Sequence, residues 1–595
     1  MKEIKEYFKS VRFTLRFAFQ FVPKLTIIIG IFFMIASSVP YGSSYVLGKL
    51  VDGVVAGTEN GLSSYVIYLL VLYAAINTLP HILSNLRRYL MRYWRLRFSQ
   101  ETEISILKSR ERIDIAHHEN PMFQDLLQRA FRNGLGPVYN LTEGQFTFLW
   151  DLTSFIIGTV LAVHFSPIIY IIVIISAVPG FIVDIKFASR GWSIWAKDSP
   201  EQRRFGDLRQ HFIGKVSLTE TKLLQSGKKL LDWMKSILVE FGKKQLTHEK
   251  SRFWAASWTD ILAFAGLAAG LFLVVRDIIV SGTQVGNVVY MLGVLSTVRG
   301  AINSLLSDIS LQYEDALIVA DIRKMTETEP IVVDVKNPQR LNLSGAPEVA
   351  FLNVSFKYPN SDTWTLRNLN MVLKPGEKIG LVGNNGAGKT TFVKLLCRIY
   401  DPTEGKILVN GINLKQISLQ EWWSYLGVMF QDYASYDFQV KEAIAIGRPD
   451  ISLDIGRIRN AAEVSQANTF IEEWKDRYDQ QIGVEFSGVE PSKGQRQKLS
   501  IAKVVYRNAK IMILDEPTAS VDAESEAKIF NSLENLSKDI TALLISHDFS
   551  TISECNQIFV LEKGELIESG NHKELMKING KYAELYNLQA ERFKK

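Results

Sequence analysis

Long apolar segments alternate with polar, basic segments from the N-terminus to about Val333. Six of the apolar segments approach the roughly 20 residues that a helix needs to cross the hydrocarbon core of a bilayer. The pattern therefore predicts an all-α transmembrane domain of six helices. We place its spans at Leu25–Leu47, Ser64–Leu83, Val138–Phe165, Ser166–Ile185, Thr259–Val280 and Val285–Ile309.

The residues before the first span, 1–24, have the pattern of an amphipathic helix. Apolar side chains recur at spacings of three and four, and basic side chains lie off that stripe. The stripe consists of Ile4, Phe8, Val11, Leu15, Ala18 and Val22. A basic amphipathic helix is typical of the headgroup layer of a membrane. We predict such an elbow helix here, with docking against protein as the alternative.

Basic residues indicate which ends of the spans face the cytoplasm. An excess of Lys and Arg marks cytoplasmic segments of membrane proteins. One cluster (Arg87, Arg88, Arg92, Arg95, Arg97) follows the second span, and another (Lys186, Arg190, Arg203, Arg204, Lys228, Lys229) follows the fourth. We therefore predict a multi-pass protein of the cell membrane with both termini and the two long connections in the cytoplasm. The net charge of +6 follows from the same bias, so no nucleic-acid partner is predicted.

The two long cytoplasmic connections, Arg87–Leu135 and Lys186–Trp258, are too long for simple loops. We expect them to be helices that extend the spans into the cytoplasm. Each contains a break, at Glu119–Pro121 and at Lys215–Gln225. A short helix near each break, such as Met122–Ala130 or Thr219–Gln225, is expected to dock on a cytoplasmic partner.

In the second half of the chain the apolar residues follow a different pattern. Short strand-like runs alternate with helical segments, a pattern that predicts a parallel sheet with helices on both faces. The runs are Val349–Leu352, Lys378–Val382, Ile511–Leu514, Ala542–Ser546 and Gln557–Leu561. The predicted organisation is an elbow helix (1–24), a transmembrane domain (25–333), a linker (334–345) and an α/β P-loop NTPase domain (346–595).

A phosphate-binding loop with the pattern G-x-x-x-x-G-K-[ST] follows one of these strands and opens a helix. Glycines let the backbone wrap around phosphates, so that its N–H groups point inward at a helix N-terminus. Lys389 supplies a charge for the β and γ phosphates, and Thr390 supplies a hydroxyl for Mg²⁺. The residues expected to contact ATP here are Gly383, Asn384, Asn385, Gly386, Ala387, Gly388, Lys389, Thr390 and Thr391.

Two carboxylates end a second apolar strand, Ile511–Leu514. Asp515 is placed to hold Mg²⁺, and Glu516 is placed to orient or deprotonate an attacking water. A loop for phosphates and a carboxylate pair, in a chain with membrane spans, indicate ATP-driven movement across a bilayer.

With these motifs, the chain resembles the ATP-binding cassette (ABC) superfamily over essentially its whole length. The resemblance assigns further residues by their order and spacing. Tyr358 matches the aromatic residue that stacks on adenine, Gln431 the glutamine that senses Mg²⁺, and His547 the switch histidine at the γ-phosphate. Ser492, Gly494 and Gln495 occupy the signature position, and Asp522 lies in the loop that links two nucleotide sites.

Six spans followed by one cassette resemble an exporter half-transporter. The resemblance implies a dimer in which each ATP lies between the phosphate loop of one cassette and the signature of the other. It also implies that the breaks near Glu119–Ala130 and Thr219–Gln225 are coupling helices. The expected activity is ATP hydrolysis coupled to export.

The signature departs from the usual Leu-Ser-Gly-Gly-Gln, because it reads Pro491-Ser492-Lys493-Gly494-Gln495. If this backbone requires a positive φ, Lys493 costs about 1 kcal/mol. A homodimer that tolerates Lys493 and a heterodimer with a second half-transporter both remain open. An ATP-gated channel or a weakly hydrolysing regulatory half is the alternative function.

Polar residues inside the predicted spans suggest a cavity for an amphipathic cargo such as a drug, peptide or lipid. They are Asn77, His81, Glu143, Asp151, Asp260, Arg299, Asn303 and Asp308, and the aromatic residues expected beside them are Phe146, Phe148, Trp150 and Trp258. Pairs between neighbouring helices are the alternative role for each polar residue.

Overall fold

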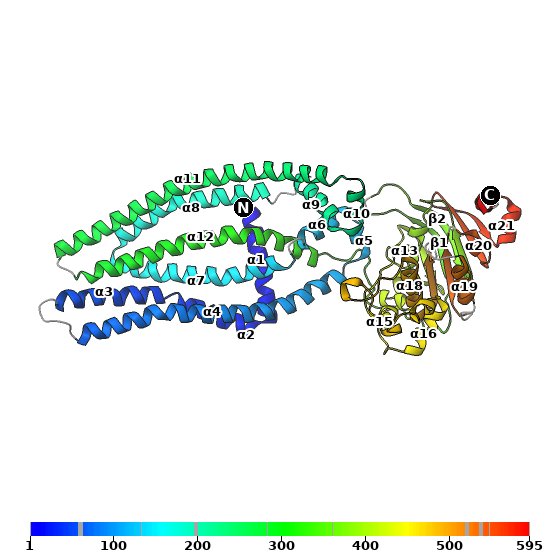
Figure 1. Cartoon of the computed structure of the whole chain (residues 1–595), viewed down its shortest axis with the longest axis horizontal. Coiled ribbons are helices and arrows are strands. Elements are labelled where there is room, and N and C mark those ends of the chain that lie inside the picture. Colours follow the sequence, from blue (N-terminus) through cyan, green and yellow to red (C-terminus); the bar gives the residue numbers. More distant parts are fainter. Residues whose placement is uncertain are drawn as a thin grey trace. The chain divides into compact units, whose positions relative to one another are not determined.

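The computed structural model describes residues 2–57, 64–131, 134–195, 200–281, 284–359, 361–517, 523–534, 539–546 and 548–593. The chain divides into two compact units. The first, residues 1–113 and 121–328, is helical. The second, residues 114–120 and 329–595, is α/β (Figure 1). A helical unit followed by an α/β unit confirms the predicted fold class.

Long helices make up the first unit (Figure 1). They are α1 (Lys2–Phe21), α2 (Pro23–Ala36), α3 (Val39–Gly57), α4 (Ser64–Glu111), α6 (Pro121–Phe131), α7 (Gly136–Phe165), α8 (Pro167–Trp195), α9 (Pro200–Ile213), α10 (Lys215–Leu223), α11 (Gly227–Ser281) and α12 (Gly286–Thr326). Helix α8 packs along α11, and α7 packs along α12.

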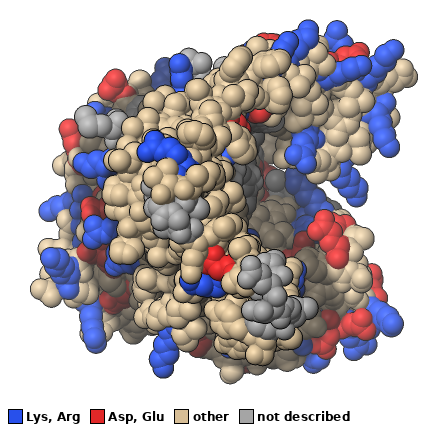
Figure 2. All heavy atoms as spheres, turned by 90° about the vertical axis from the view of Figure 1, so that its left-hand side faces the viewer, with Lys and Arg blue, Asp and Glu red and all other residues tan. Residues whose placement is uncertain are grey.

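Five helical segments in the described part of the chain are long and apolar enough to cross a membrane. They are Pro23–Ala56, Ser64–Glu111, Gly136–Phe165, Gly227–Arg276 and Gly286–Thr326. The remaining predicted span, Ser166–Ile185, lies in α8, where the apolar stretch Pro167–Gly180 is shorter. The end of this unit where α3 approaches α4 presents mostly uncharged side chains (Figure 2).

Helix α1 docks on α12 through polar side chains. Tyr7 donates from its hydroxyl to Gln312 Oε1 at 3.1 Å, and the buried Ser10 donates to the carbonyl of Ala316 at 2.7 Å. Phe8, which belongs to the predicted apolar stripe, is 63% exposed. Most of the predicted stripe nevertheless faces the helical core: Val11 and Ala18 are buried in it, and Leu15 and Val22 pack against it, so Phe8 is the exception among these residues.

The second unit contains two sheets. Its strands are β1 (Val349–Phe356), β2 (Leu366–Leu373), β3 (Lys378–Val382), β4 (Glu404–Val409), β5 (Ile412–Asn413), β6 (Leu426–Met429), β7 (Ile511–Asp515), β8 (Thr541–Ile545), β9 (Gln557–Glu562) and β10 (Glu565–Gly570). The six-stranded sheet has the order β10-β9-β3-β8-β7-β6, in which only the β10–β9 pair is antiparallel. The other sheet has the order β2-β1-β4-β5 and is antiparallel.

One predicted strand thus belongs to a different sheet from the one expected. Val349–Leu352 lies in β1, which pairs antiparallel with β2 and β4. The other four predicted runs overlap β3, β7, β8 and β9 of the six-stranded sheet. Local hydropathy predicts a strand but carries no information about its partner, so the sequence pattern alone cannot place β1 in the antiparallel sheet.

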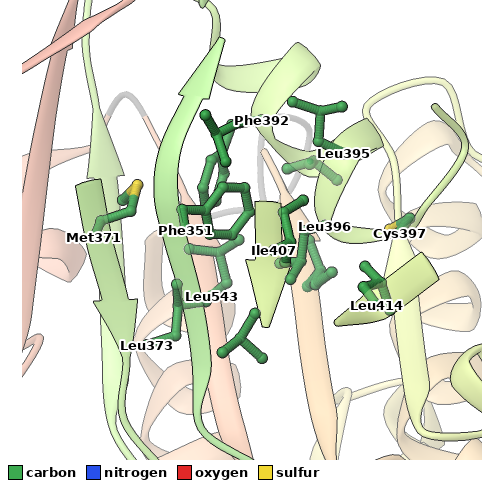
Figure 3. Close-up of a cluster of buried hydrophobic side chains, with 14 of the residues drawn as sticks. Phe351, Met371, Leu373, Phe392, Leu395, Leu396, Cys397, Ile407, Leu414 and Leu543 are labelled. Atoms are coloured by element: carbon green, nitrogen blue, oxygen red, sulfur yellow. The ribbon is translucent and has the colours of Figure 1, made fainter. Parts of the chain in front are cut away.

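Helices cover the sheets of the second unit. They are α5 (Ile115–His118), α13 (Lys389–Leu396), α14 (Leu419–Ser424), α15 (Val440–Ala445), α16 (Ile455–Val464), α17 (Asn468–Ile471), α18 (Lys493–Arg507), α19 (Ala523–Glu534), α20 (Phe549–Ile552), α21 (His572–Ile578) and α22 (Lys581–Phe593). The apolar core between the two sheets joins Phe351 of β1, Phe392 of α13, Ile407 of β4 and Leu543 of β8 (Figure 3). This core fixes α13 beside β3, and thus the loop between them.

The short segment around α5 belongs to the α/β unit although it lies between α4 and α6 in the sequence. Glu119 forms an ion pair with Lys394 at 2.5 Å and accepts a hydrogen bond from the Tyr400 hydroxyl at 2.7 Å. Met122–Ala130, which the sequence predicts to dock on a cytoplasmic partner, lies in α6, which packs on α12 in the helical unit, so its docking stays a prediction. The docked segment lies just before it, at Asp114–Asn120.

A close approach of three helices depends on the absence of a side chain at Gly158 of α7. A Cβ atom there would lie 2.3 Å from Val298 Cγ2 of α12 and 2.5 Å from the Tyr41 hydroxyl of α3. Small residues allow helices to pack tightly in membranes, where packing rather than the hydrophobic effect holds them together.

We predict that Gly158→Ala destabilises the helical unit by roughly 1–3 kcal/mol because the added methyl overpacks this contact. Gly300→Ala on α12 is the matched control, because a Cβ at Gly300 meets no atom within 4 Å. The measurement is the thermal unfolding midpoint of the purified protein in detergent. Equal midpoints for the two variants would contradict the proposed close contact.

Candidate functional site

The phosphate loop lies between β3 and α13, where the backbone turns sharply. Gly386 and Gly388 have φ angles of 80° and 102°, a region that side chains disfavour. A Cβ on Gly383 would also lie 2.4 Å from the backbone carbonyl of Leu561. The loop therefore needs glycine at these positions. Asn384, Asn385, Gly386 and Thr390 are exposed at its rim, whereas Ala387 is buried beneath it.

Lys389 folds back across this loop. Its ammonium donates to the carbonyl oxygens of Gly383 at 2.7 Å and Asn384 at 3.2 Å. Burial lowers the pKa of Lys389, and the nearby carboxylates of Asp515 and Glu516 oppose that shift. The ammonium is thus positioned at the loop, with acidic groups close enough to interact with it.

The register of the parallel strands brings the loop and the carboxylates to one edge of the sheet. Ile545 of β8 is paired with Leu381 of β3 on one side and with Asp515 of β7 on the other. The three residues therefore stand at the same level, and the segments that follow them emerge together. In open α/β sheets, ligands bind at this carboxyl edge.

Asp515 is only 5% exposed, at the end of β7. Burial raises the pKa of its carboxyl to about 6, with a further contribution from the neighbouring charge of Glu516 and an opposing one from Lys389. A buried carboxylate that must be charged to act needs a cation beside it. The site therefore favours occupation by positive charge.

Glu516 has a left-handed backbone, with φ of 50°, which costs a residue with a side chain about 1 kcal/mol or more. Three hydrogen bonds hold it in this conformation. Its N–H donates to the Ile545 carbonyl at 2.8 Å, Gln497 donates to its carbonyl at 3.0 Å, and Gln431 Nε2 donates to its Oε2 at 3.1 Å. The strain and the bonds together fix the direction of its carboxylate.

Tyr358 stands beside the helix that follows the loop. Its hydroxyl lies 3.0 Å from the hydroxyl of the buried Thr391, and its half-buried ring meets Tyr400 edge-on at 5.4 Å. The Lys394 ammonium lies 5.4 Å from the centre of the same ring. Thr391 thus faces Tyr358, and its contact with nucleotide stays a prediction.

The signature residues form the start of α18. Ser492 caps this helix by accepting from the Gln495 N–H at 3.2 Å, while Gln495 Oε1 accepts from the Ser492 N–H at 2.8 Å. Lys493 is the first residue of the helix, is exposed, and has an ordinary right-handed backbone. Lys493 therefore does not carry the cost expected for a positive φ, because the φ of a helical residue is favourable for any side chain.

Two predicted site residues, His547 and Asp522, lie outside the described residues. The structure also identifies contacts that sequence reasoning missed. Gln497 holds Glu516, and Glu119, at the predicted break, pairs with Lys394 beside Tyr358. Neither contact has a local sequence signal, because each joins residues distant along the chain.

The available donors fit a Mg²⁺ ion. Thr390, Gln431 and Asp515 offer hydroxyl, amide and carboxylate oxygens, the hard ligands that Mg²⁺ requires. Gln431 uses its amino group on Glu516, which leaves its carbonyl oxygen for a cation or water. Among the described residues no group of three or more His, Cys, Asp or Glu forms a metal cluster. Mg²⁺ commonly completes its shell with phosphate oxygens and water, so a single carboxylate suits it.

Comparisons with known proteins agree with this geometry. The ABC transporter family matches residues 366–519. The subtilin transport ATP-binding protein SpaT of Bacillus subtilis is 26% identical over 97% of this chain and 92% of its own length. An ATP-dependent lipid A-core flippase of Alkalilimnicola ehrlichii is 33% identical over 55% of this chain and 54% of its own. A bacterial Atm1-family ABC exporter solved with ATP bound shares the fold, with a TM-score of 0.80 at 20% identity over 96% of this chain and 99% of that one.

The fold and the site define an ABC-type ATPase joined to a helical unit with segments of membrane-spanning length. The chain carries an ABC transporter ATPase domain and its relatives are ABC exporters, as the resemblance predicted; in exporters this domain hydrolyses ATP to drive transport.

The raised pKa of Asp515 predicts that Mg²⁺-dependent nucleotide binding weakens as the pH falls through about 6. Below that pH the carboxyl is neutral and loses its attraction for a divalent cation. The measurement is the affinity for a fluorescent ATP analogue with Mg²⁺ and with EDTA between pH 5 and pH 8. ATP itself titrates in this range, so Asp515→Asn is the control. An identical acid limb in that variant would show that Asp515 is not the titrating group.

Proposed function

We propose that this half-transporter exports a small amphipathic cargo across the cell membrane by alternating access in a dimer, using ATP and Mg²⁺. The observation that carries the proposal is the meeting of the phosphate loop, Asp515 and the Gln431–Glu516 pair at one sheet edge. This constellation suits phosphoryl transfer to water. In a chain with membrane-spanning helices it drives transport.

The proposed roles follow from the position of each side chain. The loop amides and Lys389 hold the phosphates, and Tyr358 stacks on adenine. Thr390, Gln431 and Asp515 would hold Mg²⁺, which supplies charge that neutralises the phosphate oxygens when bound. Glu516 accepts a proton from the attacking water, oriented by its bond from Gln431. His547, which lies outside the described residues, is assigned to the γ-phosphate from the resemblance alone.

The dimer supplies the rest of each nucleotide site. We infer that Ser492, Gly494, Gln495 and Asp522 act on ATP bound to the opposite cassette. The exposed Lys493 has an unstrained helical backbone, which supports a homodimer that tolerates it. A heterodimer with a second half-transporter is the alternative. ATP shifts either dimer toward its closed state because ATP binds that state more tightly.

The polar residues of the spans divide into paired and unpaired groups. Glu143 pairs with Arg95 at 3.4 Å, and Asp260 pairs with Arg299 at 3.6 Å. By contrast, Asp308 has a buried carboxylate oxygen without a hydrogen-bond partner. Phe146 is buried in the helix core against Phe33 and Trp94, so it does not line a cavity within this chain.

An amphipathic cargo agrees with this distribution. Trp254 and Trp258 on α11 are 58% and 65% exposed, which provides apolar contact area. Asp308 provides an acidic group, and groups of this kind at membrane depth usually face the bundle interior. Among the relatives, one is named for subtilin transport and another for lipid A-core flipping, which supports the peptide and lipid classes.

Coupling between ATP and the helices is proposed to run through Glu119. This residue pairs with Lys394, whose ammonium lies over the ring of Tyr358, and it also accepts from Tyr400, which contacts the same ring. Adenine stacked on Tyr358 would therefore lie one side chain away from the segment that connects α4 to α6. Coupling free energies of 1–3 kcal/mol are typical of such links.

Glu516→Gln tests the hydrolytic function. We expect ATP turnover by the purified protein in lipid vesicles to fall by at least about 100-fold, while nucleotide binding persists, because only the proton acceptor is lost. Glu524→Gln on α19 is the control, since Glu524 is an exposed partner of Lys528. Turnover at the wild-type rate in Glu516→Gln would remove Glu516 from the mechanism. Flux of a fluorescent amphipathic dye that persists with a non-hydrolysable ATP analogue would instead favour the ATP-gated channel.

Glu119→Gln tests the coupling role. The charge opposite Lys394 is lost, so we expect the ATP concentration for half-maximal conformational change to rise roughly threefold to tenfold. The measurement is the labelling rate of Gln284→Cys, between α11 and α12, as ATP is added. Asp125→Asn removes an exposed carboxylate on α6 and serves as control. Matching responses in the two variants would exclude Glu119 from coupling.

A further inference from the structure

Helix α18 begins at the surface with the signature and is buried within two turns. Ser492 caps the helix, and Lys493 and Gly494 are its first residues. Ser492 and Lys493 are exposed, whereas Gln497, one turn further along, is only 3% exposed. The side-chain Nε2 of Gln497 donates to the main-chain carbonyl of Glu516, the proposed base, at 3.0 Å. One helix start therefore presents the signature outside and bonds the proposed base inside.

The bond from Gln497 acts on a strained main chain. Glu516 has a φ of 50°, and a residue in that region keeps its conformation only where its surroundings fix it. Its N–H donates to the carbonyl of Ile545 at 2.8 Å, so Gln497 restrains the other end of the same residue. A displacement of Gln497 would therefore rotate the main chain of the proposed base and redirect its carboxylate.

The segment that follows Gln431 is tied to the same end of α18. Tyr433 donates from its hydroxyl to the carbonyl of Lys493 at 3.3 Å, and Arg496 donates to Asp437 at 3.0 Å. Gln431 itself donates to the carboxylate of the proposed base. The two glutamines that bond this base, one on α18 and one at the start of that segment, are therefore both connected to the first two turns of α18.

We propose that Gln497 is a positioning residue that couples the two nucleotide sites of the dimer. This coupling rests on the proposed function, in which the signature of one chain acts on ATP bound to the other. When the opposite ATP draws the signature into contact, α18 moves as one body, because a packed helix deforms little. Gln497 carries the movement to the main chain of Glu516. Hydrolysis of a chain's own ATP then depends on the presence of the opposite ATP.

The test uses mixed dimers of two differently tagged full-length copies, purified and placed in lipid vesicles. One copy carries Glu516→Gln, so turnover reports only the ATP held by the other copy, the test chain. Gly494→Asp in the test chain adds an acid to the first turn of α18, where it favours the helix but repels phosphate on the opposite copy. Gln497→Met keeps the size and helix propensity of glutamine and removes the donor.

We expect either substitution to lower turnover by the test chain about threefold to tenfold, as for one hydrogen bond felt in the chemical step. The double variant should fall no further than Gln497→Met alone, because Gly494→Asp acts on the test chain's own ATP only through Gln497. Losses that multiply in the double variant would mean independent effects and overturn the proposal. Unchanged turnover in either single variant overturns it too.

Controls separate the coupling from a folding defect and from failure of the proposed function. A thermal midpoint equal to wild type shows that Gln497→Met is folded. Gln480→Met replaces another buried glutamine of the α/β unit, which donates to the carbonyl of Gln481, and should leave turnover unchanged. A loss in Gln480→Met equal to that in Gln497→Met overturns the positioning role. Wild-type turnover with Glu516→Gln in both copies overturns the proposed role of Glu516, and the coupling with it.

Discussion

The common register of β3, β8 and β7 is the constraint on which the site depends. Hydrogen bonding between parallel strands sets Leu381, Ile545 and Asp515 at one level. Because these strands are buried on both faces, a slip of one residue would turn every side chain to the opposite face of the sheet. The phosphate loop, the strand carboxylates and the segment after β8 meet only because this register is kept.

The same arrangement buries charged groups whose ionised forms are unfavourable in the absence of a ligand. Burial lowers the pKa of Lys389 and raises that of Asp515, so each group is pushed toward its neutral form. The strained backbone of Glu516 adds a further free-energy cost, and hydrogen bonds from Gln431 and Gln497 hold the residue in place. A nucleotide with its cation would bring both signs of charge into the site and relieve these costs. Binding energy is therefore available to reshape the surrounding segments.

Those segments connect the site to the rest of the chain through side chains rather than through the sheet. Glu119 joins the α5 segment to Lys394 and Tyr400. In the helical unit, α1 is tied to α12 by Tyr7 and Ser10, and α7 meets α12 at Gly158. Tight contacts and specific hydrogen bonds of this kind transmit displacement better than loosely packed apolar surface, because packed interiors deform little.

The sequence alone determined the features that depend only on residues near one another in the chain. Hydropathy over about 20 residues marked the long helices, and the glycine pattern with Lys389 marked a loop after a strand, because each depends only on neighbouring residues. Tertiary structure decided which strands pair with β1, and that Asp114–Asn120 belongs to the α/β unit whereas Met122–Ala130 belongs to the helical unit. It also decided that Lys493 is unstrained and that Gln497 holds Glu516. Each of these follows from contacts between residues far apart in the chain, whose partners no local spacing specifies.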